Sequence, residues 1–321
     1  MTDEQRITGA NPRTGMSGSE WQKHRPAVFG VAYRLLGSVA DAEDVVQDVW
    51  LRTTRTRSED IADHRAWLVT VAARRAYDIL RSARVRREEY VGPWLPEPLL
   101  TGPDASEPVL VDESVGAAMM LVMEELSPPE RVAFVLRDVF RLETAVIATV
   151  LDRSPAATRQ LASRARRAIA RAGAAGAADD ESPGASRAER ERVLLAFRAA
   201  YEAGDLKALV RLLHPDAVLL TDGGGEVFAA RKPITGGRRV AEVLLRVARK
   251  RRSETTLVPV EVGGEPALLR RRADGVTHSV DTMLVRDGLI VAYWRQLTPS
   301  KLTHVRQRAA VTPGWAVSST W

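Results

Sequence analysis

Three aspartates in one short stretch have the spacing of a binding surface. Asp41, Asp44 and Asp48 follow one another at three- and four-residue steps, so on a helix their carboxylates share one side. Apolar side chains from Val45 to Trp50 lie next to them. Carboxylates on an apolar base offer charge together with area to bury, and the stretch therefore predicts a helix that docks a protein partner.

A second stretch, residues 154–167, is rich in arginine and predicts contacts with DNA. Ser154 is suited to cap a helix, and a proline such as Pro155 is tolerated in a first helical turn. The apolar side chains form a narrow stripe, made of Leu161, Ala165 and Ile169. The polar side chains then point outward, and they are Arg159, Gln160, Ser163, Arg164 and Arg167. Arginine pairs well with guanine and glutamine with adenine, although a solvated helix face is the simpler alternative.

The residues before Ser154 complete a helix-turn-helix pattern. A helix is expected from Glu143 to Val150, and a tight turn at 151–153 leads into the basic helix. Asp152 stands where glycine is common, and aspartate is among the few other residues that adopt the left-handed conformation at modest cost. An ordinary helical hairpin is the alternative. A basic, capped second helix after a tight turn favours DNA binding.

The composition excludes several classes of protein. The chain has 321 residues with 47 Lys and Arg against 41 Asp and Glu, and a net charge of +6 is a weak argument for a polyanionic partner. The distribution matters more, because arginines cluster at 74–87 and at 153–171. The absence of cysteine excludes disulfides, thiolate metal sites and a cysteine nucleophile. We expect neither a metal nor a cofactor.

Breaks in composition divide the chain into units. Three prolines within 92–98 exclude a regular helix and predict an extended strap. No segment has the apolar length of a signal peptide or a membrane span, so a cytoplasmic location without a membrane partner is expected. The predicted units are a disordered leader at 1–20, a helical module at 21–90, the proline-rich strap at 91–111, a second helical module at 112–171, a flexible linker at 172–187, a third domain at 188–303 and a tail at 304–321.

The third domain combines helices with short strands. Amphipathic helices are expected at 188–204, 206–213 and 237–250. Alternating or apolar runs between glycine-containing turns predict strands at 217–220, 226–230, 256–262, 267–271, 276–285 and 289–295. The expected architecture is therefore two all-α modules followed by an α+β cone with a curved antiparallel sheet.

Several of these motifs resemble those of a known family. Residues 29–90 resemble region 2 of the extracytoplasmic-function sigma factors, a group of the sigma-70 family, with Asp41–Asp48 in the place of the helix that binds core RNA polymerase. Arg65–Leu68 and Arg74–Arg81 are similar to its promoter-melting segment. Leu126–Phe140 and the helix-turn-helix resemble region 4. The resemblance implies a transcription initiation factor that recognises −35 and −10 promoter elements and promotes DNA melting.

The resemblance also implies roles for individual residues. The expected contacts with core polymerase are Asp41, Glu43, Asp44, Gln47 and Asp48. The expected contacts with melted DNA are Trp67, Arg74, Arg75, Tyr77 and Arg81, although burial is the favoured interpretation for Trp67 and Tyr77 taken singly. The expected contacts with upstream duplex DNA are Ser154, Thr158, Arg159, Gln160, Ser163, Arg164 and Arg167.

The strap and a later glycine run resemble one branch of that family, whose sigma modules are fused to a SnoaL-like, nuclear-transport-factor-2-like domain. This implies regulation by the C-terminal domain, and a free protein that is compact and opens on polymerase. The expected interdomain contacts are Trp94, Leu95, Pro96, Asp222, Gly223, Gly224, Gly225, Lys301 and Leu302. Residues 298–302 read Thr-Pro-Ser-Lys-Leu where the family favours Asn-Pro-Asp-Lys-Leu, so Thr298 and Ser300 depart from the pattern.

Two alternatives keep the C-terminal domain apart from transcription. A cone with an aspartate base and a histidine suits a small-molecule cyclase or isomerase, and the candidates are His214, Asp222, His278 and Asp281. In the second alternative, the cavity of the cone binds a small molecule without catalysis, and the protein is a DNA-binding regulator that senses this ligand. A helix end is favoured for His214, a strand for His278 and a turn for Asp222. Gly223–Gly225 is not a phosphate loop, because no Lys-Ser/Thr pair follows it.

Overall fold

The computed structural model describes residues 16–56, 61–88, 90–101, 123, 126–174, 185–251 and 255–307. Residues 1–15 of the predicted leader, the end of the strap, most of the second linker and most of the tail lie outside these residues. The predicted leader extends to residue 20, but α1 begins at Gly18 with Ser17 as its cap. The helix expected from residue 112 also lies outside them, apart from Met123 and Leu126. Among the described helices, none combines the length and apolar character needed to cross a lipid bilayer.

Three helices form the first module: α1 (Gly18–Leu36), α2 (Val39–Thr53) and α3 (His64–Glu88). Gly37 ends α1 in the left-handed conformation, with φ of 69°. Ser38 then caps α2, because its side chain accepts a hydrogen bond from the Asp41 N–H at 3.3 Å. The Gly37-Ser38 pair therefore forms the turn between α1 and the acidic helix.

The second module contains α6 (Pro128–Phe134), the π-helical turn η2 (Val135–Val139), α7 (Thr144–Leu151) and α8 (Pro155–Ala174). Ser127 and Glu130 form a reciprocal capping box at the start of α6. Asp152 has φ of 53° and ψ of 53°, and Ser154 caps α8 by accepting from the Ala157 N–H at 3.2 Å. The predicted turn between α7 and α8 is confirmed in both its left-handed aspartate and its serine cap.

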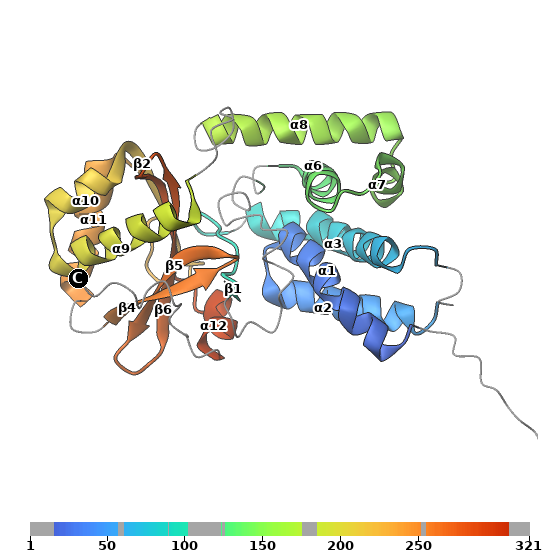
Figure 1. Ribbon diagram of the computed structural model, residues 1–321, viewed down its shortest axis with the longest axis horizontal. Coiled ribbons are helices and arrows are strands. Elements are labelled where there is room, and N and C mark those ends of the chain that lie inside the picture. Colours follow the sequence, from blue (N-terminus) through green and yellow to red (C-terminus); the bar gives the residue numbers. More distant parts are fainter. Residues whose placement is uncertain are drawn as a thin grey trace, which may run out of the picture.

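The two modules share one hydrophobic core. Its buried members come from α1, α2, α3, α6, η2, α7 and α8. Arg131 of α6 joins the modules directly, since its guanidinium donates to the Leu35 carbonyl at 2.9 Å and to the Met123 carbonyl at 2.7 Å. Figure 1 shows α8 across the top of the molecule, with α6 and α7 between it and α3. The two modules therefore form one compact body in this state.

The C-terminal domain, residues 185–307, places helices on one face of a sheet. The helices are α9 (Arg187–Ala203), α10 (Leu206–Leu212) and α11 (Gly237–Arg251). The long strands are β2 (Leu213–Asp222), β4 (Thr255–Val262), β5 (Glu265–Arg272), β6 (Thr277–Arg286) and β7 (Leu289–Gln296). Short η3 (Ser300–Leu302) and α12 (Thr303–Gln307) close the described part of the chain. The predicted combination of helices with a sheet is confirmed.

The sheet departs from the prediction in one respect, because it is mixed. Its strand order is β1-β4-β5-β6-β7-β2-β3, with β1 (Leu100–Thr101) and β3 (Ile234–Thr235) at the edges. The pairing of β2 with β7 is parallel, and the other pairings are antiparallel. The first long strand of the domain therefore runs in the same direction as the last.

The two faces of the sheet are covered by different partners. Leu268 points to the core beneath α9, α10 and α11, whereas its neighbours Ala267 and Leu269 belong to a second cluster. That second cluster includes Leu100 of the strap, together with Leu302 and Val305 after the last strand. The strap is therefore part of the folded C-terminal domain and adds an edge strand to it.

Two local predictions are corrected. No strand forms at 226–230, because the Gly223 carbonyl accepts from the N–H groups of Glu226 and Val227 and turns the chain tightly. Phe228 in that segment is 100% exposed. His214 is not at a helix end but is the second residue of β2, where its ring accepts from the Asp216 N–H at 3.1 Å.

Candidate polymerase and nucleic-acid interfaces

The acidic edge, defined as Asp41, Glu43, Asp44, Gln47 and Asp48, lies on the outside of α2. Asp41, Asp44 and Gln47 are exposed, while Val45, Val46 and Val49 on the opposite side are buried in the shared core. The helical repeat places the polar residues on one side of α2 and the valines on the other. The compact arrangement of the modules therefore leaves the acidic edge accessible.

Two members of the acidic edge are held by arginines. Glu43 forms an ion pair with Arg25 at 2.8 Å, and Asp48 forms one with Arg75 at 2.6 Å. Both pairs are partly exposed, so each is worth little for stability and is open to exchange for another cation. Leu51, one turn beyond Asp48, is 55% exposed and continues the edge with an apolar side chain.

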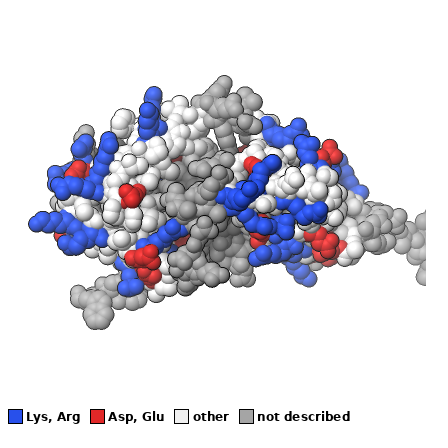
Figure 2. All heavy atoms as spheres, turned by 90° about the horizontal axis from the view of Figure 1, so that it is seen from above, with Lys and Arg blue, Asp and Glu red and all other residues white. Residues whose placement is uncertain are grey.

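The outer face of α8 is basic. Seen from above, basic side chains (blue) gather over this helix, and those of α8 itself are all arginines (Figure 2). Five of its predicted DNA contacts are exposed on this face, namely Arg159, Gln160, Ser163, Arg164 and Arg167. The predicted stripe of Leu161, Ala165 and Ile169 is buried against the core.

Two further residues at the start of α8 have structural roles. Ser154 is exposed and caps the helix. Thr158 is 1% exposed, and its hydroxyl donates to the Ser154 carbonyl at 3.0 Å. A side chain with that burial is not available to DNA, so Thr158 positions the first turn and is not retained among the DNA contacts.

The residues predicted to contact melted DNA lie along α3 and differ in exposure. Arg74 and Arg81 are exposed, and the Arg81 guanidinium lies 5.8 Å from the centre of the Tyr77 ring. Tyr77 is 9% exposed and belongs to the core, as its burial interpretation predicts. Trp67 is partly buried and packs against the same core. Arginines therefore form most of the accessible surface of this stretch.

The strap, here its described residues 91–101, is attached to the first module. The Glu97 carboxylate accepts from the Val39 N–H at 2.8 Å and so caps the start of α2. The Glu97 N–H donates to the Gly37 carbonyl at 2.9 Å, and the Tyr33 hydroxyl donates to the Glu97 carbonyl at 2.6 Å. Trp94 packs on Gly37 so closely that a Cβ at that glycine would lie 2.4 Å from the indole.

The same strap is attached to the C-terminal domain through Asp222, which is fully buried. Its carboxylate accepts from the Leu95 N–H at 2.8 Å, from the Tyr90 hydroxyl at 2.6 Å and from the Lys301 ammonium at 2.8 Å. The Lys301 ammonium also donates to the Leu95 carbonyl at 2.8 Å and lies 4.2 Å from the centre of the Trp94 ring. The predicted contacts Trp94, Leu95, Asp222 and Lys301 therefore come together at one point.

The electrostatics of this point favour an ionised Asp222. Burial alone would raise the pKa of the carboxyl group, but the adjacent Lys301 charge and the hydrogen bonds from Lys301, Tyr90 and Leu95 outweigh burial and lower the pKa below its usual value. Burial and the bond to Asp222 raise the pKa of the Tyr90 hydroxyl, which stays a donor. The Asp222–Lys301 pair, together with the hydrogen bonds from Tyr90 and Leu95, holds the strap in one position.

The glycine loop, Asp222–Gly225, approaches the strap with its backbone. A Cβ on Gly224 would lie 2.6 Å from the Thr298 methyl group and 3.1 Å from the Tyr90 hydroxyl. Gly225 faces Val91, and Gly223 has no room for a Cβ beside the Val227 carbonyl at 2.4 Å. A side chain at Gly223 or Gly224 would collide with these atoms, and at Gly225 it is the φ of 76° that favours glycine.

The two residues that depart from the family pattern also make contacts. The Thr298 hydroxyl donates to Asp222 at 2.9 Å, and the Ser300 hydroxyl and N–H both bond to the Glu226 carboxylate. Pro96 offers its carbonyl to Gln296 at 3.5 Å, and Leu302 is buried beside Leu100 in the second cluster. The nine predicted interdomain residues thus all lie in or beside the strap contact.

Sequence reasoning missed several residues of this contact. Tyr90, Glu97 and His304 bond to partners elsewhere in the chain, and Gln296 donates to the Leu95 carbonyl at 3.1 Å. Gln296 and His304 were not singled out because an isolated polar residue gives no pattern. Glu97 could have been found as an acid placed near the start of α2, had the path of the strap been known.

The candidate catalytic carboxylates are fully engaged. Asp281 accepts two bonds from Arg295, at 2.9 and 2.8 Å, and one each from Tyr293 and Ser279. Burial would raise its pKa, but Arg295 and Arg270 lower the pKa to about 2. Neither Asp281 nor Asp222 lies on the outer surface, and in both the carboxylate oxygens are occupied.

The arrangement thus comprises a helix with a free acidic edge, a capped basic helix after a left-handed turn, and an arginine-bearing helix beside them. These are the parts of a sigma-70 protein. Residues 21–86 match the family model described as Sigma-70 region 2, and residues 117–169 match that described as Sigma-70, region 4. The chain belongs to the extracytoplasmic-function sigma factors, which act in transcription initiation, as the first relative below shows.

That relative is similar along nearly its whole length. The chain is 41% identical over 301 residues to the extracytoplasmic-function sigma factor SigJ of Mycobacterium tuberculosis, covering 90% of this chain and 94% of that protein. It is 33% identical over 253 residues to the probable sigma factor SigI of the same species, covering 78% and 82%. The crystal structure of Mycobacterium tuberculosis SigJ superposes with a TM-score of 0.72 at 37% identity, covering 89% of this chain and 98% of that one.

Proposed function

We propose that this sigma factor binds core RNA polymerase through the acidic edge of α2 and promoter DNA through the outer face of α8. The observation that carries the proposal is the acidic edge, in which Asp41, Asp44 and Gln47 stay exposed although the valines on the opposite side of the helix are buried. The ion pairs with Arg25 and Arg75 hold two of the carboxylates in place without removing them from solvent. Arg74 and Arg81 of α3 would then contact the unstacked strand of the −10 element.

The test is promoter-directed transcription with purified core polymerase and the full-length protein. The double variant Asp41→Ala/Asp44→Ala should lose at least about tenfold in polymerase affinity, since it removes charge from an interface without changing the core. The control variant Asp216→Ala/Glu242→Ala removes two carboxylates from the C-terminal domain. Equal polymerase binding by the two double variants would contradict the assignment of the acidic edge.

We further propose that the C-terminal domain restrains initiation by holding the strap. The strap is bonded on one side to Tyr33, Gly37 and Val39 and on the other to Asp222 and Lys301. It therefore ties the domain to the module that carries the acidic edge. A sigma factor has to spread its modules over polymerase, and each contact that must break first costs free energy.

The restraint is tested by a substitution that weakens the attachment of the strap and replaces only one non-hydrogen atom of the Asp222 side chain. The variant Asp222→Asn keeps the shape of the side chain but loses the charge that pairs with Lys301, so the strap should release more easily and initiation should rise. Asp216→Asn is the matched control on the exposed part of β2. Lower initiation by Asp222→Asn would mean that the contact supports initiation, and the restraint would be wrong.

The C-terminal domain is proposed not to be an enzyme. A general base needs a carboxylate with a free lone pair aimed at substrate, near hydrogen-bond distance. The carboxylates of Asp222 and Asp281 are each bonded to several donors, and they are paired with the partly buried Lys301 and the buried Arg295. With a pKa of about 2, Asp281 would also be a very weak base.

A further inference from the structure

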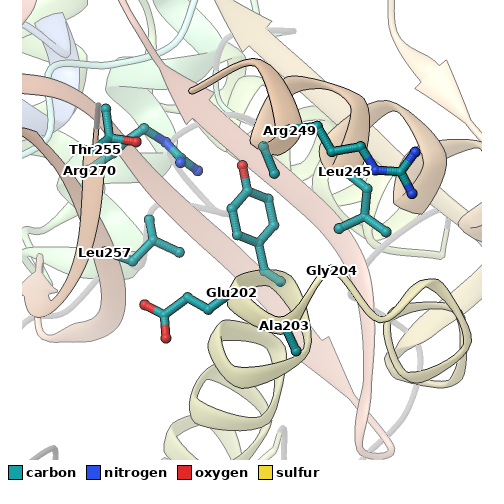
Figure 3. A pocket seen from close by; sticks show the side chains of 10 residues that line it. Glu202, Ala203, Gly204, Leu245, Arg249, Thr255, Leu257 and Arg270 are labelled. Atoms are coloured by element: carbon teal, nitrogen blue, oxygen red, sulfur yellow. The ribbon is translucent and has the colours of Figure 1, made fainter. Parts of the chain in front are cut away.

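A pocket opens in the C-terminal domain, away from the strap contact (Figure 3). It lies between the end of α9, the last turns of α11, the start of β4 and Arg270 of β5, and its volume is about 420 Å³. Figure 3 shows Leu245 and Leu257 on opposite walls, with the Arg270 guanidinium directed toward the space between them. The volume is in the range of pockets that hold small organic molecules.

Buried polar atoms at the wall of this pocket lack partners. Arg270 and Tyr201 are 3% and 5% exposed. Within the described residues, the Nε and Nη2 atoms of Arg270 and the hydroxyl of Tyr201 have no hydrogen-bond partner. The Arg270 guanidinium lies 5.0 Å from the centre of the Tyr201 ring, so the unpaired groups are neighbours. Folded proteins rarely leave such groups unsatisfied, and each one calls for an explanation.

The charge around Arg270 is also unbalanced. Arg295 and Arg270 are both buried beside a single buried carboxylate, that of Asp281. Arg295 takes both oxygens of that carboxylate at hydrogen-bond distance, whereas Arg270 approaches no closer than 3.5 Å. Glu202 at the rim of the pocket is exposed and pairs with Arg198 at 3.0 Å. One positive charge is therefore left over, and it belongs to the arginine that faces the pocket.

We propose that this pocket binds a small organic carboxylate with an apolar body. The carboxylate accepts from the Arg270 guanidinium and the Tyr201 hydroxyl, and thereby satisfies the unpaired donors and the excess charge. The apolar body lies between Leu245, Ala248 and Leu257. The site binds without bond cleavage.

The experiment uses the full-length protein and three matched pairs of compounds: phenylacetate, cyclohexanecarboxylate and hexanoate, each with its neutral amide. Titration calorimetry should show saturable one-to-one binding of at least one acid, with its amide weaker by about tenfold or more because the amide carries no charge. The proposal is overturned if no acid binds at concentrations up to about 10 mM, the weak end of measurable affinity. It is also overturned if acid and amide bind equally.

Two variants locate the binding. Arg270→Gln should lower the affinity for the acid by about tenfold or more. Tyr201→Phe, which keeps the ring but removes the hydroxyl, should lower that affinity by several-fold. Arg238→Gln removes an arginine that is 78% exposed on α11 and should leave binding unchanged. If Arg270→Gln does not fold, Tyr201→Phe and the pocket-filling Leu245→Trp decide the matter. Wild-type affinity in both of these would overturn the site.

Discussion

Asp281 shows how a carboxyl group at the centre of a domain is kept charged. The group is fully buried, and desolvation opposes its ionisation. Four hydrogen bonds and two nearby guanidinium groups reverse that effect and hold the pKa at about 2. The buried carboxylate of Asp222 is likewise kept ionised, by the charge of Lys301 and by the hydrogen bond from Leu95 of the strap. The first carboxylate binds only groups of its own sheet, whereas the second binds a distant segment.

We predict that Asp281→Asn lowers the free energy of unfolding by about 3–5 kcal/mol at neutral pH, because it leaves Arg295 buried without its counter-charge. The pKa of the folded carboxyl group is below that of an unfolded aspartate. Its stabilising contribution is therefore complete above about pH 4 and is lost as the pH falls toward 2.

Urea unfolding of the full-length protein checks both parts of this prediction. The wild-type protein should lose its advantage over Asp281→Asn between about pH 4 and pH 2. Asp216→Asn, on the exposed side of β2, serves as the reference for an aspartate without a buried partner. An unchanged gap between wild type and Asp281→Asn over that pH interval would mean that the charge pair is not the source of the stability.

At the scale of the element, capping residues made some helix ends predictable. Ser154 and Gly204 each stand at a predicted helix terminus, because caps act over three or four residues. Pairing across the chain was not accessible in this way. The parallel contact of β2 with β7 and the Tyr90–Asp222 bond, which spans 132 residues, depend on the whole fold. The loop at 226–230 carries the sequence signal of a strand because Val227–Ala230 form a continuous apolar run shortly after a glycine turn.

The basic helix α8 should show two kinds of contact. Arg159→Ala should weaken binding to all duplexes and reduce the slope of log K against log salt by about 0.9, the value for one phosphate contact. Gln160→Ala should change the preference among upstream sequences by about 1–3 kcal/mol with little change in slope. Arg246→Ala on exposed α11 is the control. Fluorescence anisotropy over a salt series distinguishes these outcomes, and an identical effect of Arg159→Ala and Arg246→Ala would exclude α8.

The glycine loop offers a comparison between two glycines with nearly equal backbone angles. Gly224 has φ of 59° and Gly263 has φ of 56°, so alanine is equally strained at both. A Cβ at Gly224 would collide with Thr298 at 2.6 Å, whereas none lies within 4 Å at Gly263. We predict that Gly224→Ala exposes the strap to limited proteolysis and destabilises the protein by about 1–3 kcal/mol more than Gly263→Ala. Equal effects would show that the strap does not depend on this close approach.

At the scale of the whole molecule, the strap connects the shared helical core to the C-terminal domain, where the glycine loop lies beside it. The sequence and its family resemblance predicted the modules and the interdomain residues. They did not show that Glu97 caps α2 while the adjacent Pro98 carbonyl accepts from His304. The strap thus bonds to the first module and to the C-terminal domain at neighbouring residues. Any movement of one body relative to the other has to break these bonds.

We predict that core polymerase separates the two helical modules. The chain contains no cysteine, so Arg55→Cys and Ala145→Cys introduce a unique pair of labelling sites at exposed positions on the two modules. Energy transfer between dyes at these sites should fall when polymerase is added. Lys23→Cys with Arg55→Cys, both in the first module, should give a constant signal. A constant signal from the first pair would show that the modules bind polymerase in their present arrangement.

The distance along the chain between the strap and its partners has a consequence for protein synthesis. The core of the helical modules uses residues only up to Ile169 among those described, whereas Lys301 lies more than a hundred residues later. A ribosome adds about 5–20 residues per second, so the modules precede Lys301 by roughly 6–25 s. Each new molecule therefore spends its first seconds with a complete acidic edge and no restraint on its strap. If the C-terminal domain restrains initiation as we propose, the acidic edge of a ribosome-bound chain is complete before that restraint can form.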